Sequence, residues 1–120
     1  MAALILNAQV SNPKIFGHRG CRGILPENSI AGFQKAIDLG IDGIEFDVVV
    51  NKDKQIVISH APFMEKKYCL LPDGRKIKRE KELNLFEMKQ TEIEKFDCGS
   101  KFHSNFQKQK KLKTHKPLLQ

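Results

Sequence analysis

Long hydrophobic runs are missing from this sequence. Its longest apolar stretches, Ala2–Leu6 and Val48–Val50, fall far short of the roughly 20 residues needed to cross a membrane, so no transmembrane segment is expected. Internal repeats are missing as well. With 120 residues, of which 40% are hydrophobic and 29% charged, the composition indicates one globular domain rather than a disordered chain.

Cysteine is scarce, and its pattern excludes two kinds of site. Cys21, Cys69 and Cys98 are odd in number and form no CxxC pair, so neither a disulfide framework nor a structural zinc site is expected. Cys21 lies close to His18 on a tight loop, which disfavours a nucleophilic role for this thiol. A nucleophilic serine signature is also absent. The glycine-rich stretch Gly17–Gly23 matches neither the P-loop nor the dinucleotide-binding pattern.

Positive charge is in excess, with a formal net charge of +7. Much of it lies near the end, at Lys101, Lys108, Lys110, Lys111, Lys113 and Lys116. A basic run of this kind attracts nucleic acid or an anionic membrane surface. The segment lacks interleaved aromatics and zinc-finger spacing, so a solvated loop is favoured and no nucleic-acid partner is expected. The overall field would still attract a small anionic substrate.

The N-terminus leaves the compartment open. Residues 2–9 are apolar and small, but no basic segment precedes them, and the stretch is too short for a complete signal peptide. Residues 1–13 are interpreted as a lead that is either part of a cytoplasmic protein or the remnant of a signal peptide, which would make the protein periplasmic or secreted.

The first half of the chain shows a strand, a helix and two further strands. A short strand ends at His18, and a helix follows with Asn28 or Ser29 as its N-cap and Gly40 at its end. Further strands are predicted over residues 43–50 and 55–60. These strands are short and apolar, as in a sheet that is covered on both faces.

The second half begins with a long segment that has no periodic pattern. Residues 61–82 exceed most connections in compact domains, and such loops are often functional. A short helix is then predicted, with Thr91 as its cap and Ile93 and Phe96 on its buried side.

Two acidic residues stand on one strand, at Glu45 and Asp47. Residues i and i+2 of a strand point to the same face, so both carboxylates would reach one cation. Oxygen ligands suit Mg²⁺ or Ca²⁺. Taken alone, the pair also fits a solvent-exposed or arginine-paired face.

Two histidines fall at strand ends, where they would face each other. Histidine in general titrates near neutrality, so an imidazole pair at His18 and His60 would share proton donation and acceptance. Arg19 has a guanidinium group suited to a phosphate oxygen. His103 and His115 are interpreted as structural or surface residues.

Taken together, these motifs resemble the N-terminal part of the glycerophosphodiester phosphodiesterase family. The family pattern is an HRG strand end, a PEN helix start, an ExD strand and a histidine that closes the next strand. Here the motifs are His18-Arg19-Gly20, Pro26-Glu27-Asn28-Ser29, Glu45-Phe46-Asp47 and Ser59-His60. Later segments, 91–99 and 116–119, resemble the following helix and the start of the next one, so residues 14–120 are assigned to such a domain.

The resemblance implies a fold, a site and a reaction. The fold is α/β, a partial TIM (β/α)₈ barrel made of the first strands and helices, with the site at the strand ends. The residues matching His18 and His60 act as general acid and base, and those matching Glu45 and Asp47 bind a divalent cation, Mg²⁺ or Ca²⁺. The residue matching Arg19 contacts the substrate phosphate, and Glu27 belongs to the same site. The reaction is hydrolysis of a small glycerophosphodiester to an alcohol and glycerol 3-phosphate.

The sequence departs from the family pattern in three ways. The family commonly has aspartate after the second histidine, where this chain has Ala61. A full barrel takes about 250 residues, and the family's third metal ligand, a glutamate on a later strand, has no counterpart before Gln120.

The alternatives are a truncated, inactive fragment that binds anions or a partner, and a related phospholipase-type phosphodiesterase. Because strand edges would be exposed, the isolated chain is expected to be poorly stable or to aggregate.

Overall fold

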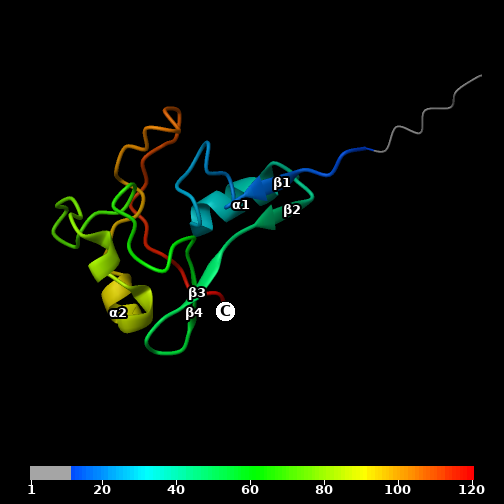
Figure 1. Ribbon diagram of the computed structural model, residues 1–120. Coiled ribbons are helices and arrows are strands. Elements are labelled where there is room, and N and C mark those ends of the chain that lie inside the picture. The colour runs from blue at the N-terminus through cyan, green and yellow to red at the C-terminus, as the bar shows by residue number, and fades with distance from the viewer. Residues whose placement is uncertain (1–11) are drawn as a thin grey trace, which may run out of the picture.

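The computed structural model describes residues 12–120, so nearly all of the N-terminal lead lies outside the described residues (Figure 1). The elements are β1 (Phe16–His18), α1 (Ile30–Asp38), β2 (Gly43–Glu45), β3 (Val48–Val50), β4 (Ile56–Ile58), the 3₁₀ turns η1 (Glu80–Glu82) and η2 (Leu85–Glu87), and α2 (Gln90–Ile93). Within residues 12–120, neither helix has the length and hydrophobicity needed to cross a membrane.

The first half forms a βαβ unit, as predicted. β1 and β2 pair in parallel, and α1 connects them and lies beside them (Figure 1). Ser29 is the N-cap of α1, because its hydroxyl accepts a hydrogen bond of 3.0 Å from the backbone N–H of Gly32. Gly40 follows the helix with φ of 67°, the left-handed conformation that glycine adopts readily. These local signals place α1 where the sequence predicted it.

The single strand predicted over residues 43–50 is two strands. β2 pairs in parallel with β1, whereas β3 pairs antiparallel with β4. The backbone shows where the partner changes: Arg19 N–H donates to Glu45 O over 2.7 Å, and Ser59 N–H donates to Asp47 O over 2.9 Å. Phe46 lies between these two bonds. The chain therefore leaves one sheet and enters the other between the two acidic residues.

The hydrophobic core is formed largely by the long loop over residues 61–82 and the segments that pack against it, and not by side chains between the strands. The buried apolar cluster includes Val57, Met64, Leu85, Ile93 and Phe96, and it is completed by Tyr68, Cys69, Ile77 and Cys98. The loop over 61–82 thus has little regular structure but supplies much of the interior. The two-sided burial predicted for the strands is not seen, because apolar strand residues such as Phe16, Val48 and Ile56 stay largely exposed.

A disulfide bond joins Cys69 to Cys98, and the expectation of no disulfide is wrong. The two cysteines are 29 residues apart, and both are buried in the core. Their pairing depends on how the long loop folds back onto the segment after α2, which no local spacing reveals. Within residues 12–120, Cys21 is the free cysteine.

Two further predictions are corrected by the structure. α2 begins at Gln90, with Lys89 as its cap rather than Thr91, because the Lys89 N–H donates to the carboxylate of Glu92 over 2.8 Å. Lys116 is not part of a solvated loop: only 3% of it is exposed. Its ammonium group has specific partners in the interior, described below. Burial of Ile93 and Phe96 is confirmed.

Candidate active site

His18 and Glu45 lie opposite each other on neighbouring strands. They are the last residues of β1 and β2, and the parallel register pairs them directly. His18 Nε2 is 3.6 Å from Glu45 Oε2, and about half of each side chain is exposed. The short strand predicted before His18 therefore positions this imidazole beside one of the two candidate metal ligands.

Arg19 lies between two carboxylates. Its Nη1 donates to Glu27 Oε1 over 2.8 Å, and its Nε is 3.2 Å from Asp47 Oδ2. Burial alone would lower the pKa of Arg19, but the hydrogen bond and charge of Glu27 outweigh it and raise this pKa above its ordinary value. Arg19 is thus a fixed cation, and Glu27, of which 3% of the side chain is exposed, holds it in place.

His60 stands at the other side of the site and faces an acid that the sequence did not indicate. Its Nδ1 is 3.9 Å from Glu65 Oε1. The other oxygen of Glu65 accepts a hydrogen bond from the hydroxyl of Tyr68. Burial first, and then the charges of Glu27 and Glu65, raise the pKa of Tyr68 well above 10, so its phenol stays protonated and donates.

Lys116 completes this chain of contacts from the interior. Its Nζ donates to Ser59 Oγ over 2.8 Å and to the Tyr68 hydroxyl over 3.2 Å, and it lies 5.2 Å from the centre of the Tyr68 ring. Hydrogen bonds therefore run from Lys116 through Tyr68 to Glu65, and Glu65 faces His60. The sequence did not indicate Glu65, Tyr68 or Lys116 as site residues. Lys116 is far from the other two in the chain, and only the folding of the loops brings them together.

A cavity of about 250 Å³ unites the two sides. Its wall includes Arg19, Glu27, His60 and Glu65, together with Tyr68 and His103. Three of the six predicted site residues, Arg19, Glu27 and His60, therefore line one hollow. The other three, His18, Glu45 and Asp47, are connected to it through Arg19: its side chain contacts Asp47, and its backbone N–H lies 3.3 Å from the Glu45 carboxylate.

The carboxylate oxygens of Glu45 and Asp47 are ligands of the kind that a hard divalent cation prefers. Two such residues do not make a complete ligand set. Asp47 Oδ2 is buried and has no hydrogen-bond partner among the described residues, despite its closeness to Arg19. An acceptor in this state fits a cation. Over residues 12–120, no group of three His, Cys, Asp or Glu side chains is placed to hold a metal. The described chain thus offers part of a ligand set.

Comparisons with known proteins identify relatives of this chain. A model of the "Glycerophosphoryl diester phosphodiesterase family" matches residues 18–119. The chain is 35% identical over 92 residues to a glycerophosphodiester phosphodiesterase of Caldanaerobacter subterraneus, covering 77% of this chain and 33% of that protein. Its fold matches a crystal structure of a putative glycerophosphoryl diester phosphodiesterase from Silicibacter pomeroyi, with a TM-score of 0.84, 29% identity and coverage of 91% of this chain and 38% of that one.

A second solved structure has a bound product. It is an Oleispira antarctica phosphodiesterase in complex with sn-glycerol-3-phosphate, with a TM-score of 0.64 and 26% identity, covering 89% of this chain and 37% of that one. The chain spans between 19% and 33% of the first two curated relatives that it matches. Its architecture accordingly corresponds to one part of the TIM barrel of those structures.

Proposed function

Because the chain belongs to the glycerophosphoryl diester phosphodiesterase family, we propose that its site hydrolyses glycerophosphodiesters to an alcohol and glycerol 3-phosphate with the help of a divalent cation. The observation that supports this most is the cavity in which Arg19, held by Glu27, lies with His60 and next to the two carboxylates. Phosphodiester cleavage uses a fixed cation and an imidazole at one hollow, with oxygen ligands for a metal beside it.

Arg19 binds the substrate phosphate in this proposal. Its guanidinium carries a permanent charge, and its orientation is fixed by the Glu27 carboxylate. A phosphodiester carries one negative charge, which increases at the oxygens as the new bond forms. Arg19 would stabilise that charge without moving, which is how a preorganised donor lowers a barrier.

His18 and His60 carry the proton transfers. One imidazole accepts the proton of the attacking oxygen while the other donates a proton to the oxygen of the leaving alcohol, so the alcohol leaves uncharged and the negative charge stays on the phosphate of glycerol 3-phosphate. Glu65 faces Nδ1 of His60 and favours the tautomer with its proton on that nitrogen, which directs Nε2 toward the reaction. Glu45 has the corresponding place beside Nε2 of His18.

Glu45 and Asp47 would hold the cation, which would neutralise charge on the phosphate when bound. The Glu45 carboxylate is about half exposed, and Asp47 offers the buried acceptor oxygen described above. The two carboxylates lie on either side of the point where the strand changes sheets, and this places them at the C-terminal end of β2.

The test is a direct assay of the chain. The protein is incubated with sn-glycero-3-phosphocholine and Mg²⁺ or Ca²⁺, and glycerol 3-phosphate is measured against a His18→Ala variant and against samples with a chelator. Product that depends on both His18 and the cation is expected. An absence of product beyond the His18→Ala background would overturn the proposed activity of this chain and leave its family unaffected. A parallel sample with lysophosphatidylcholine distinguishes a phospholipase-type enzyme, which would prefer the acylated substrate.

A further inference from the structure

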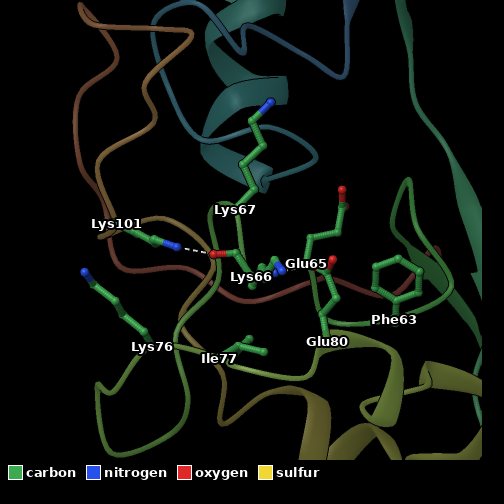
Figure 2. A pocket seen from close by; sticks show the side chains of 8 residues that line it. All are labelled: Phe63, Glu65, Lys66, Lys67, Lys76, Ile77, Glu80 and Lys101. Carbon is green, nitrogen blue, oxygen red and sulfur yellow. Dashed lines mark hydrogen bonds between the residues drawn. The ribbon is translucent and has the colours of Figure 1, made fainter.

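A second cavity adjoins the candidate active site and is surrounded by lysines. Its volume is about 550 Å³, and its wall contains Lys66, Lys67, Lys76 and Lys101 together with Glu65 and Glu80 (Figure 2). Glu65 and Lys67 also line the smaller cavity that holds Arg19 and His60. The two hollows therefore share part of their lining.

Covalent and backbone contacts hold the lysines in place. The Cys69–Cys98 disulfide ties the segment after Lys67 to the segment before Lys101. Lys101 Nζ donates to the carbonyl oxygen of Lys66, a contact drawn as a dashed line in Figure 2. The Lys66 N–H in turn donates to the carboxylate of Glu80 over 2.8 Å. The backbone around the cavity is thus held by cross-linked loops, and the side chains of Lys66, Lys67 and Lys76 are exposed on it.

The charges around this cavity are not balanced. Four lysines and two glutamates line it, and one of these carboxylates, Glu80, is already engaged by the backbone of Lys66. Burial lowers the pKa of Lys101, and the neighbouring Lys76 and Lys66 lower it further, against the opposing effect of Glu80. The lowered pKa of Lys101 means that positive charge is costly at this position, so an anion beside it would be stabilised.

Figure 2 shows how the side chains that line the larger cavity are directed. Lys101 reaches the loop at Lys66, while the side chain of Lys67 extends away from that contact. Lys67 lines both hollows, so this residue lies between them. An anion in the lysine-lined cavity and a phosphate at Arg19 would need a linker between them that passes Glu65 and Lys67. The alcohol moiety of a diester substrate is the natural linker.

We propose that the cavity around Lys66, Lys76 and Lys101 binds an anionic group carried by the alcohol moiety of the substrate, so that the site prefers glycerophosphodiesters with a second phosphate. The proposal rests on the proposed function, because it takes the phosphodiester to lie at Arg19. Phosphate fits the cavity because several ammonium groups share its charge and donate to its oxygens.

The test compares two diesters that differ only in this group. Binding of sn-glycero-3-phosphoglycerol, and of the same diester with a phosphate on its terminal hydroxyl, is measured by calorimetry in a His18→Ala background, which prevents turnover. Lys66→Gln/Lys76→Gln removes two charges from the cavity and keeps the contact between Lys101 and the Lys66 backbone. Lys108→Gln/Lys111→Gln removes two exposed charges elsewhere and is the matched control.

The phosphorylated diester is expected to bind about tenfold more tightly, which corresponds to about 1.4 kcal/mol. That advantage should vanish in Lys66→Gln/Lys76→Gln and persist in the control. Equal binding of the two diesters would overturn the proposal that the cavity binds a second phosphate. In that case, hydrolysis of sn-glycero-3-phosphoglycerol by the unsubstituted chain would show that the proposed function still holds. Loss of the advantage in the control as well would assign the effect to overall charge and overturn the proposal.

Two further probes identify the source of the anion. Inorganic phosphate and phosphatidylglycerol vesicles are titrated into the same variants. If the diesters bind equally while the vesicles or free phosphate bind through Lys66 and Lys76, the cavity serves a separate anion and the proposal is wrong. If neither diester binds at all, both this proposal and the proposed function fail.

Discussion

Lys116 places an ammonium group in the interior, where its recorded contacts are the hydroxyls of Ser59 and Tyr68 rather than a carboxylate. Burial lowers its pKa to about 8 from the ordinary 10.5, although Glu65 and Glu27 act in the opposite direction. Between these two pH values the unfolded chain binds a proton that the folded chain has lost. The free energy of unfolding should therefore rise with pH over this window.

Replacing Lys116 with methionine should reduce this pH dependence and stabilise the fold. Methionine fills a similar volume without a buried charge, and the Tyr68 hydroxyl keeps its acceptor on Glu65. We expect the free energy of unfolding at pH 7 to increase by about 1–3 kcal/mol, measured by urea denaturation from pH 7 to pH 9.5. Some dependence should remain, because the pKa of Lys101 is lowered too. An equal slope in both proteins would contradict this account of Lys116.

Glu65 is the residue whose neutralisation should most affect His60 without disturbing the fold. In Glu65→Gln the shape and the hydrogen bond from Tyr68 are kept, but the charge that faces Nδ1 of His60 is lost. If the chain is active, kcat should fall by about tenfold or more, with KM little changed, because only the proton transfer is affected. The imidazole nitrogen signals of His60, followed by NMR, should show a changed tautomer. An unchanged spectrum would argue that Glu65 only supports the loop.

Among the elements, α1 connects local sequence most directly to the site. Ser29 accepts from Gly32 and donates to Pro26 O over 2.6 Å, so one hydroxyl fixes both the helix start and the segment that contains Glu27. Ser29→Ala should lower the free energy of unfolding by about 1–2 kcal/mol, because both bonds are buried. Urea denaturation measures this, with the exposed Ser104→Ala as the control. A loss no larger than that of the control would contradict the cap's importance.

The elements also show which features sequence can predict. Ser29 and Gly40 act on their immediate neighbours, so α1 and the strand before His18 were predicted where they occur. The division of residues 43–50 into β2 and β3 was not, because it depends on which distant strand each half meets. The same holds for the site: strand-end residues such as His18 could be predicted, whereas contacts made by Glu65 depend on the fold of a long loop.

Across the whole molecule, the βαβ unit and the antiparallel pair of β3 and β4 leave many apolar side chains exposed to solvent. Phe16, Ile37, Val48 and Ile56 are each between 43% and 62% exposed. Contiguous exposed apolar surface favours association. We expect the chain to self-associate as its concentration rises, measured by light scattering after size-exclusion chromatography. Ile37→Lys should reduce association, and Leu112→Lys, which changes an exposed apolar residue outside the βαβ unit, should not. A monomer at every concentration tested would contradict this expectation.

The cross-link between Cys69 and Cys98 has a consequence for the order of synthesis. A ribosome adds roughly 5–20 residues per second, so Cys98 is made seconds after Cys69, given their separation of 29 residues. During that interval the thiols already made include Cys21 and Cys69, whose pairing is not the native one. An oxidant that acts faster than translation would join Cys21 to Cys69 first. A slower oxidant would act after Cys98 has been made, when Cys69 can pair with it.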